Sequence, residues 1–374
     1  MQIDAAISAK LIEGFANLGW QNVVMMTVGA ILIYLAIARQ YEPVLLLPIG
    51  AGAILANIPM TGMTEGEGVF KVLYDAGIKN ELFPLLIFIG VGAMTDFGPL
   101  LERPYTVILG AAAQFGIFGT LLMATLLGFN IKEAASIGII GSADGPTSIF
   151  VASALAPHLL APIAVAAYSY MSLVPIIQPP IMRLLTTEAE RGIVMPYTSK
   201  PVAHRTKIIF PIVVTLVCGL IAPMSAPLIG MLMLGNLLRE AGVVERLSSM
   251  AQNELINIVT LFLGLTIGST MVGERFIQPQ TLMIIGMGLV AFSLDTVAGL
   301  SFGKALSIIT RGKINPLIGA SGISAFPMSA RVVNRVGLEA NSNNFLIMHA
   351  MGSNTAGQIG SVMAGGAVLA LLWR

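Results

Sequence analysis

The sequence is poor in charged residues and contains a single cysteine. Of its 374 residues, 10% are charged and 56% are hydrophobic, whereas a soluble domain carries about 25% charged residues. So few charges cannot cover a water-facing surface, which predicts that lipid is the main solvent of this chain. The net charge of +1 shows no basic excess, so nucleic acid is not an expected partner.

Several kinds of chemistry lack the residues they need. Cys218 lies alone in an apolar run, which excludes a disulfide framework. The three histidines, at 158, 204 and 349, show no metal-ligand spacing. The run GLSFGKA at 299–305 is one residue too short for a phosphate-binding loop and lacks the following Ser or Thr. ATP is therefore not the expected energy source.

Long apolar runs are abundant, and they predict an all-α polytopic membrane protein. A spanning helix needs about 20 mostly apolar residues. The candidate spans are 22–38, 42–59, 82–101, 104–129, 157–182, 208–223, 226–241, 255–272, 281–303 and 345–373. Two further segments, 132–156 and 305–331, are apolar but interrupted by Gly, Pro and polar residues. We therefore expect about 10 to 11 transmembrane segments together with two broken or re-entrant hairpins, preceded by an interfacial helix within residues 1–20.

A polar linker at 183–207 divides the chain into halves, 1–182 and 208–374. Its basic residues outnumber its acidic ones, which predicts a cytoplasmic location. Three short runs of the first half resemble runs of the second in the same order. The matched residues are Asn57 with Asn236, Gly90 with Gly264, and Gly141 with Gly319, at offsets of 179, 174 and 178 residues. This pattern favours two related halves, and an odd number of elements between them predicts an inverted repeat of the kind found in secondary transporters.

The first broken segment contains GSADGPTS at 141–148, with an ionisable residue, Asp144, between glycines and before Pro146. A carboxyl group at membrane depth is costly and marks a functional site. Backbone carbonyls that the helix break leaves without hydrogen bonds must line a polar cavity at that depth. Carboxylate, hydroxyl and carbonyl oxygens suit a hard cation such as Na⁺. Asp144 is therefore the expected centre of a cation site, against the alternative of a solvated interfacial loop.

The second broken segment supplies further polar groups that an inverted repeat would bring to Asp144. Asn315 and Ser324 are expected to face Asp144 across one site. Arg331 follows by about two helical turns and is interpreted as an anion ligand, a counter-charge to Asp144, or an interfacial anchor beside Arg335.

Other intramembrane polar residues leave more than one interpretation open. Tyr170 is interpreted either as a group that donates a proton or hydrogen bond to the site or as a packing residue. Gln178, followed by two prolines, marks an irregular helix. Asp96 and Asn354 are further polar groups within apolar runs.

Four long strings closely resemble the β-subunit of biotin-dependent, Na⁺-pumping decarboxylases. They are GSADGPTSIF (141–150), AAYSYMSLVPIIQPPIM (166–182), KINPLIGASGISAFPMSARV (313–332) and NFLIMHAMGSNTAGQIGS (344–361). The resemblance implies an inverted-repeat transporter with two re-entrant hairpins that moves like an elevator. It also implies a multi-pass protein of the bacterial inner membrane that decarboxylates carboxybiotin, takes up a proton and exports Na⁺.

The resemblance also assigns residues and partners. It implies Na⁺ ligands at Asp144, Asn315, Gly319 and Ser324, and catalytic roles for Asp144, Tyr170 and Arg331, with Arg331 contacting carboxybiotin. It implies a carboxyltransferase α subunit, a biotin carrier subunit, a small γ or δ membrane subunit, and a homo-oligomer within the complex. The chain contains no Met-Lys-Met biotinylation site, so carboxybiotin is expected to arrive on a partner.

Two other functions use the same residues. A Na⁺/H⁺ antiporter or Na⁺-coupled carboxylate symporter would use the same broken segments and Asp144, but would transport without a biotinylated partner. An intramembrane aspartyl protease would need Asp96 and Asp144 on facing helices, sharing a proton.

Overall fold

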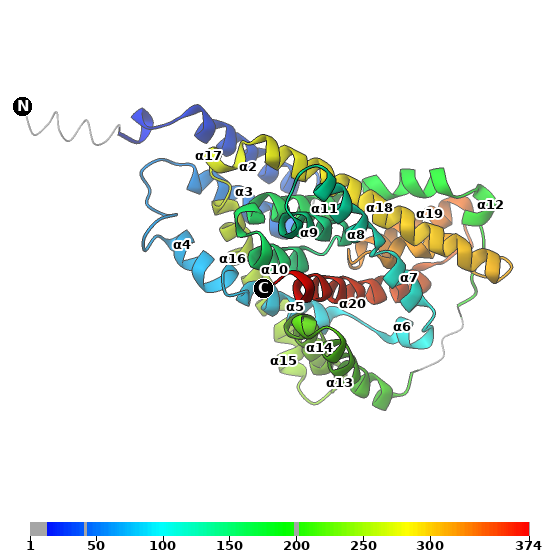
Figure 1. Ribbon diagram of the computed structural model, residues 1–374. Coiled ribbons are helices and arrows are strands. Elements are labelled where there is room, and N and C mark those ends of the chain that lie inside the picture. The colour runs from blue at the N-terminus through cyan, green and yellow to red at the C-terminus, as the bar shows by residue number, and fades with distance from the viewer. Residues whose placement is uncertain (1–12, 41–42, 198–201, 374) are drawn as a thin grey trace, which may run out of the picture. The chain divides into compact units, whose positions relative to one another are not determined.

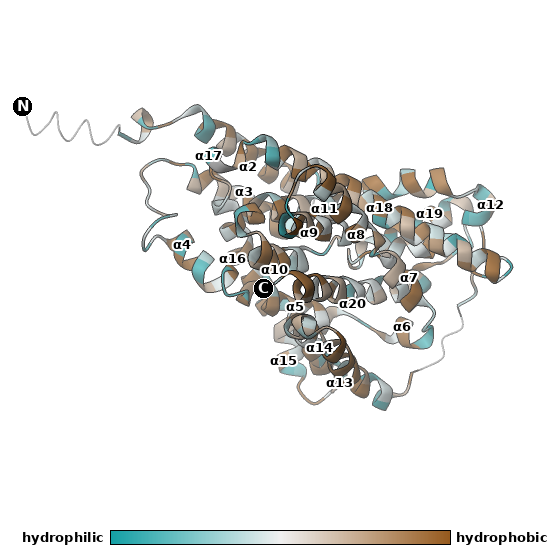
Figure 2. Cartoon of the chain, viewed as in Figure 1, coloured by the Kyte–Doolittle hydropathy of each residue, from teal (hydrophilic) through white to brown (hydrophobic). Residues whose placement is uncertain are grey.

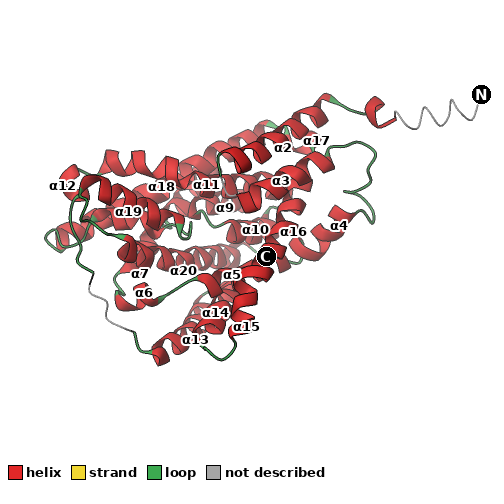
Figure 3. Cartoon of the chain, turned by 180° about the vertical axis from the view of Figure 1, so that it is seen from behind, coloured by secondary structure: helices red, strands yellow, loops and turns green. Residues whose placement is uncertain are grey.

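The computed structural model describes residues 13–40, 43–197 and 202–373. Within these ranges every regular element is helical, and no strand occurs (Figure 3). The all-α prediction is therefore confirmed for the described part of the chain. Residues 1–12 of the expected interfacial helix, and 198–201 of the linker, lie outside the described residues.

The elements follow one another in a chain of long helices, short helices and tight turns. The helices before residue 130 are α2 (Trp20–Ala38), α3 (Pro43–Ala56), α4 (Val69–Leu73), the π-helical η1 (Tyr74–Ile78), α5 (Leu82–Met94), α6 (Gly98–Glu102), α7 (Thr106–Ala112) and α8 (Phe115–Leu126). Those up to the linker are α9 (Ile131–Gly138), the 3₁₀ turn η2 (Ile139–Ser142), α10 (Gly145–Leu155), η3 (Pro157–Leu159), α11 (Leu160–Leu185) and α12 (Glu188–Arg191).

The remaining elements lie in the second half. They are α13 (His204–Ile221), η4 (Pro223–Ser225), α14 (Ala226–Glu240), α15 (Glu245–Met250), the π-helical η5 (Ala251–Leu255), α16 (Ile256–Ser269), α17 (Gly273–Phe276), α18 (Pro279–Ile309), the 3₁₀ helix η6 (Pro316–Gly322), α19 (Met328–Ala340) and α20 (Ile347–Leu372).

Fewer helices than expected have the length of a membrane span. Among the described residues, six helical stretches are long and apolar enough to cross a bilayer, or eight if each of two bent pairs counts as one span. The expected 10 to 11 spans included 42–59 and 226–241, but the helices there, α3 and α14, have only 14 and 15 residues. A span needs about 20 residues, because each residue adds only about 1.5 Å.

The apolar residues of several helices face outward, where lipid can cover them. Figure 2 shows predominantly hydrophobic colouring along α13, and only 11% of that helix, His204–Ile221, is buried. Leu220 and Leu216 on α13 are 81% and 59% exposed. Many buried side chains are polar instead, including Asn57, Gln178 and Asn354. This inverted distribution, together with the long helices, makes the chain a multi-pass membrane protein.

The chain forms two compact units, and the first comprises residues up to Phe83 with Asn257–Met283. Helices α2 and α3 meet here at two glycines, since a Cβ on Gly29 would meet the backbone of Gly50. The buried amide of Asn57 donates to the carbonyl of Met271 at 2.8 Å and accepts from the N–H of Gly273 at 3.0 Å. Asn57 therefore ties the end of α3 to the turn before α17.

The second unit, Pro84–Ile256 with Ile284–Arg374, contains both broken segments. Helix α20, red in Figure 1, packs against α7, α10, α19 and η6. The long stretch Pro157–Leu185 bends by 64° between Met171 and Leu173. Pro175 explains the bend, because its ring has no N–H for the carbonyl of Met171, four residues earlier.

Candidate functional site

Asp144 lies where the first broken segment changes direction. Helix α9 tightens into η2, and Ala143 then adopts a left-handed conformation with φ of 53°. Asp144 is the N-cap of α10, and Pro146 falls in the first turn, where a missing N–H does no harm. The glycines and proline that mark the segment in the sequence therefore form a helix–turn–helix break with the carboxyl group at its centre.

The Asp144 carboxyl group is surrounded by hydroxyl groups. It is 7% exposed. The Thr147 N–H donates to Oδ1 at 3.1 Å, while the Thr147 and Ser361 hydroxyls donate to Oδ2 at 2.8 and 2.7 Å. No Lys, Arg or His within the described ranges pairs with Asp144. A hydroxyl oxygen that donates here still has lone pairs for a cation, so the donor set suits a hard monovalent ion.

A backbone hydrogen bond joins the two broken segments. The Ser324 N–H donates to the carbonyl of Ser142 at 2.9 Å, two residues before Asp144. The Ser324 hydroxyl donates to the carbonyl of Gly357 on α20, also at 2.9 Å. The structure thus brings Ser324 to the segment that carries Asp144, as a backbone partner of that segment.

Asn315 and Gly319 have other neighbours. The Asn315 amide donates to the carbonyls of Arg191 and Ile193 at 2.9 Å each, and its oxygen accepts from Leu317 N–H at 3.0 Å. It therefore fastens the start of η6 to the linker, and it does not contact Asp144. Gly319 lies against α18, since a Cβ there would meet the backbone of Gly299.

Three buried amide side chains hold the second broken segment. Each donates to backbone carbonyls of residues 320–323, and the three come from different parts of the fold. The contacts are Gln178 to Ala320 (2.8 Å), Asn354 to Ser321 (3.1 Å) and Ile323 (2.7 Å), and Gln114 to Gly322 (3.2 Å). These donors satisfy one acceptor position on each of the carbonyls that the break leaves without helical hydrogen bonds. We call Gln114, Gln178 and Asn354 the amide clamp.

Replacing Gln178 by methionine tests the amide clamp. Methionine has a similar length but no amide, so the buried carbonyl of Ala320 loses its donor. We expect the free energy of unfolding to fall by about 1–3 kcal/mol, measured as a lower unfolding midpoint in detergent. The control is Gln278→Met, because the Gln278 amide is exposed. That change should alter stability by less than about 0.5 kcal/mol, and equal effects would contradict the clamp.

Tyr170 and Arg331 do not contact Asp144. The Tyr170 hydroxyl donates to the carbonyl of Ile285 on α18. Arg331 is exposed on α19. On the next turn of the same helix, Arg335 donates to the carbonyl of Pro175 at 3.0 Å. The ring packed against the Asp144 break belongs to Tyr168, because a Cβ on Gly145 would meet that ring.

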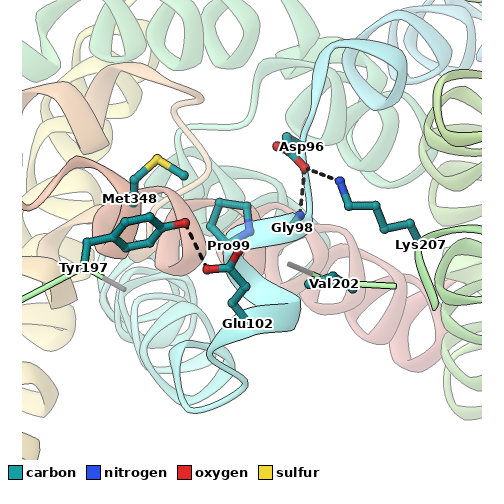
Figure 4. A pocket seen from close by; sticks show the side chains of 8 residues that line it. All are labelled: Asp96, Gly98, Pro99, Glu102, Tyr197, Val202, Lys207 and Met348. Atoms are coloured by element: carbon teal, nitrogen blue, oxygen red, sulfur yellow. Dashed lines mark hydrogen bonds and ion pairs between the residues drawn. The ribbon is translucent and has the colours of Figure 1, made fainter. Parts of the chain in front are cut away.

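Asp96 lies apart from Asp144, in a surface pocket of about 320 Å³. Figure 4 shows its carboxylate directed at Lys207 and at the N–H of Gly98. The Lys207 Nζ is 3.7 Å away, and the Gly98 nitrogen is 2.8 Å away. The two carboxyl groups have different partners and do not share a hydrogen bond. The pair that an aspartyl protease needs is therefore not formed.

Sequence reasoning did not single out Ser361 or Asp295. Ser361 is an unremarkable serine in the sequence, and only the packing of α20 on α10 reveals its contact with Asp144. Asp295 is completely buried in the middle of α18. The rule that identified Asp144, an ionisable residue inside an apolar run, applies equally to Asp295 and could have found it.

The chain is similar to known proteins over nearly its whole length. Residues 21–372 match the family described as Na⁺-transporting oxaloacetate decarboxylase beta subunit. The chain is 56% identical over 360 residues to glutaconyl-CoA decarboxylase subunit beta of Acidaminococcus fermentans, covering 96% of each chain. It is 56% identical over 360 residues to methylmalonyl-CoA decarboxylase subunit beta of Veillonella parvula, covering 96% of this chain and 95% of the relative. It is 48% identical over 417 residues to oxaloacetate decarboxylase beta chain of Klebsiella pneumoniae, covering 95% of this chain and 96% of the relative.

Proposed function

Because the chain belongs to the Na⁺-transporting decarboxylase β-subunit family, we propose that it decarboxylates carboxybiotin and uses that reaction to export Na⁺. Carboxybiotin would arrive on a biotin carrier subunit that a carboxyltransferase α subunit has loaded. A small γ or δ membrane subunit and further copies of this chain would complete the complex. The observation that carries the proposal is the buried Asp144 carboxyl group, which accepts from the hydroxyls of Thr147 and Ser361 and which no basic side chain of the described residues neutralises.

The proposed reaction links a proton to the cation. Decarboxylation breaks the bond between the biotin nitrogen and the carboxyl carbon, releases CO₂, and leaves the electron pair on nitrogen, which takes up one proton. Water around the carboxylate slows this step, so a dry site accelerates it. We assign Asp144 to the coupling, alternating between a Na⁺-bound carboxylate and a protonated acid. Ser324, which bonds the segment before Asp144, is a proposed further Na⁺ ligand. Asn315 and Gly319 are proposed ligands that η6 would bring to the ion by moving from their present contacts. Tyr170 is a proposed proton donor.

We propose that the chain is an inverted repeat, in which an elevator-like movement carries the site at the two broken segments from one side of the membrane to the other. Two sets of equivalent contacts support this proposal. Asn57 binds the carbonyl of Met271 at 2.8 Å, and Asn236, 179 residues after Asn57, binds the carbonyl of Thr95 at 2.9 Å. The serine hydroxyls of the broken segments repeat at the same spacing, from Ser142 to Ile139 and from Ser321 to Ile318.

The proposed function is tested by isolating the complex from native membranes on avidin. After reconstitution into liposomes, Na⁺ uptake should require a decarboxylation substrate and should stop when avidin blocks biotin. Glutaconyl-CoA, methylmalonyl-CoA and oxaloacetate are offered in parallel, and we propose a CoA ester, since the relatives named for CoA esters reach 56% identity. Na⁺ transport by this chain without a biotinylated partner would instead support the antiporter or symporter.

Arg331 is proposed to hold the carboxylate end of carboxybiotin, because its exposed side chain is open to an incoming partner. Arg331→Ala should raise the concentration of carboxylated carrier needed for half-maximal activity roughly ten- to 100-fold, the effect of losing one charge-assisted hydrogen bond. Steady-state kinetics with purified carrier measure this change. Arg335→Ala, one turn away, removes the same charge and should have a much smaller effect. Equal effects would favour a shared role in interfacial anchoring.

A further inference from the structure

A second buried carboxyl group, that of Asp295, lies in the same unit as Asp144 and has no part in the proposed Na⁺ site. Asp295 is fully buried near the midpoint of the 31-residue helix α18. At about 1.5 Å per residue it lies about 21 Å or more along the helix from either end. An uncompensated charge at such a position is strongly unfavourable.

One oxygen of Asp295 has an evident structural role. The Gly116 N–H donates to Oδ1. Gly116 belongs to the first turn of α8, whose N-cap is Gln114. Asp295 therefore satisfies a free N–H at the start of α8 from a neighbouring helix. This contact explains Oδ1 but leaves Oδ2 unexplained.

The other oxygen, Oδ2, has no hydrogen-bond donor within the part of the chain that the structure describes. It faces Gly141 of η2, because a Cβ on Gly141 would lie 2.5 Å from Oδ2 and 3.2 Å from the carbonyl oxygen of Ala291. Only glycine leaves room for a carboxyl group here. An ionised oxygen without a donor is not stable in such surroundings, so Oδ2 needs an occupant.

The neighbours of Asp295 decide between a proton and a metal cation. Its described neighbours include the backbone of Gly116 and Ile117 from α8, Gly141 from η2 and Ala291 from its own helix, and none of these residues is titratable or charged. From α11, Tyr170 contacts Ile285 and Gly288, about two turns away along α18. A hard cation needs several oxygen ligands, and among the described residues these gather at Asp144 and not at Asp295. A proton needs one acceptor, and the Ala291 carbonyl beside Gly141 can provide it.

We propose that Asp295 is a proton-binding site, which holds a neutral carboxylic acid beside the first broken segment. Its role in the pump rests on the proposed function. Gly141 and Asp144 belong to the same short segment, three residues apart. A shift of this segment when Na⁺ leaves Asp144 changes the surroundings of Oδ2, and so couples the proton on Asp295 to the cation on Asp144.

Infrared spectroscopy of the purified complex tests the protonated state directly. With Na⁺ saturating Asp144, we expect a carbonyl band of a protonated carboxyl group that shifts in D₂O, persists in Asp144→Asn and disappears in Asp295→Asn. Asparagine keeps an acceptor for the Gly116 N–H and offers a donor to the Ala291 carbonyl, so folding should survive. If the asparagine variant fails to assemble, Asp295→Glu must move the band. A band unchanged in these Asp295 variants, or absent from the wild-type complex, overturns the proposal.

A transport measurement separates this inference from the proposed function. Asp295→Asn should slow decarboxylation by about 100-fold, the lower end of what positioned proton transfer contributes. Because asparagine mimics the neutral acid, the Na⁺ concentration for half-maximal activity at acidic pH should stay unchanged, and it should no longer vary with pH. A large change in that concentration would make Asp295 part of the Na⁺ site and overturn the inference. If the wild-type complex does not respond to Na⁺, the proposed function fails while the infrared result still stands.

Discussion

Replacing Asp144 by asparagine is expected to abolish Na⁺-dependent decarboxylation and Na⁺ transport by the assembled complex. A carboxylate about 4 Å from a monovalent cation contributes about 4 kcal/mol at the effective dielectric constant of protein sites, or roughly 1000-fold in affinity. Asparagine is as good an N-cap as aspartate, so it can still accept the Thr147 N–H and keep the start of α10 in place. The loss is measured as Na⁺ uptake and CO₂ release in liposomes.

The matched control for Asp144→Asn is Ser361→Ala. This change removes one of the two hydroxyl donors to Oδ2 but keeps the negative charge. Loss of a group that orients a ligand lowers affinity or activity by about 10- to 100-fold, so we expect a partial loss that excess Na⁺ restores. Full Na⁺ transport in a folded Asp144→Asn complex would contradict the assignment of Asp144 as the cation-binding carboxylate.

The sequence predicts the helices well where hydropathy and helix-breaking residues agree. Apolar runs indicated α20 and α18, and the Gly and Pro residues at 141–146 indicated the first break. The sequence predicts the second break too early, at residue 305, because small and polar residues also occur inside α18. Helix α18 continues to Ile309, and the chain leaves it at Arg311 and Gly312, both with positive φ. Hydropathy also overestimates the length of α3, since apolar residues continue beyond its helical hydrogen bonds, whereas α14 ends within one residue of its predicted span.

The candidate site was predictable only in part, for a physical reason. An ionisable residue in an apolar run is recognisable from its sequence neighbours alone, so Asp144 could be identified without the structure. Its partner Ser361 is 217 residues away, and only the packing of α20 against α10 brings the two together. The amide clamp is also a product of packing. Gln178 could be read as a mark of helix irregularity, but not as the donor to Ala320.

Replacing Gly299 of α18 by alanine is expected to displace the second broken segment, which packs against it. A Cβ on Gly299 would meet the carbonyl of Gly319, and both groups are backbone, so no side chain can move aside. Overpacking of this kind costs about 1–3 kcal/mol. The η6 helix would have to move away from α18, which strains the hydrogen bond between Gln178 and Ala320. We expect a lower unfolding midpoint in detergent together with loss of Na⁺-dependent activity.

Gly286→Ala is the matched control, because Gly286 lies on the same helix and a Cβ there would meet no atom within 4 Å. Alanine has the higher helix propensity by roughly 0.5–1 kcal/mol, so this variant should be at least as stable as the original and fully active. The contrast also defines the role of Gly319, which has no side chain to offer an ion. If Gly299→Ala keeps both stability and Na⁺ dependence, close packing of α18 on η6 is not required. The Na⁺-binding role proposed for Gly319 would then not depend on that packing.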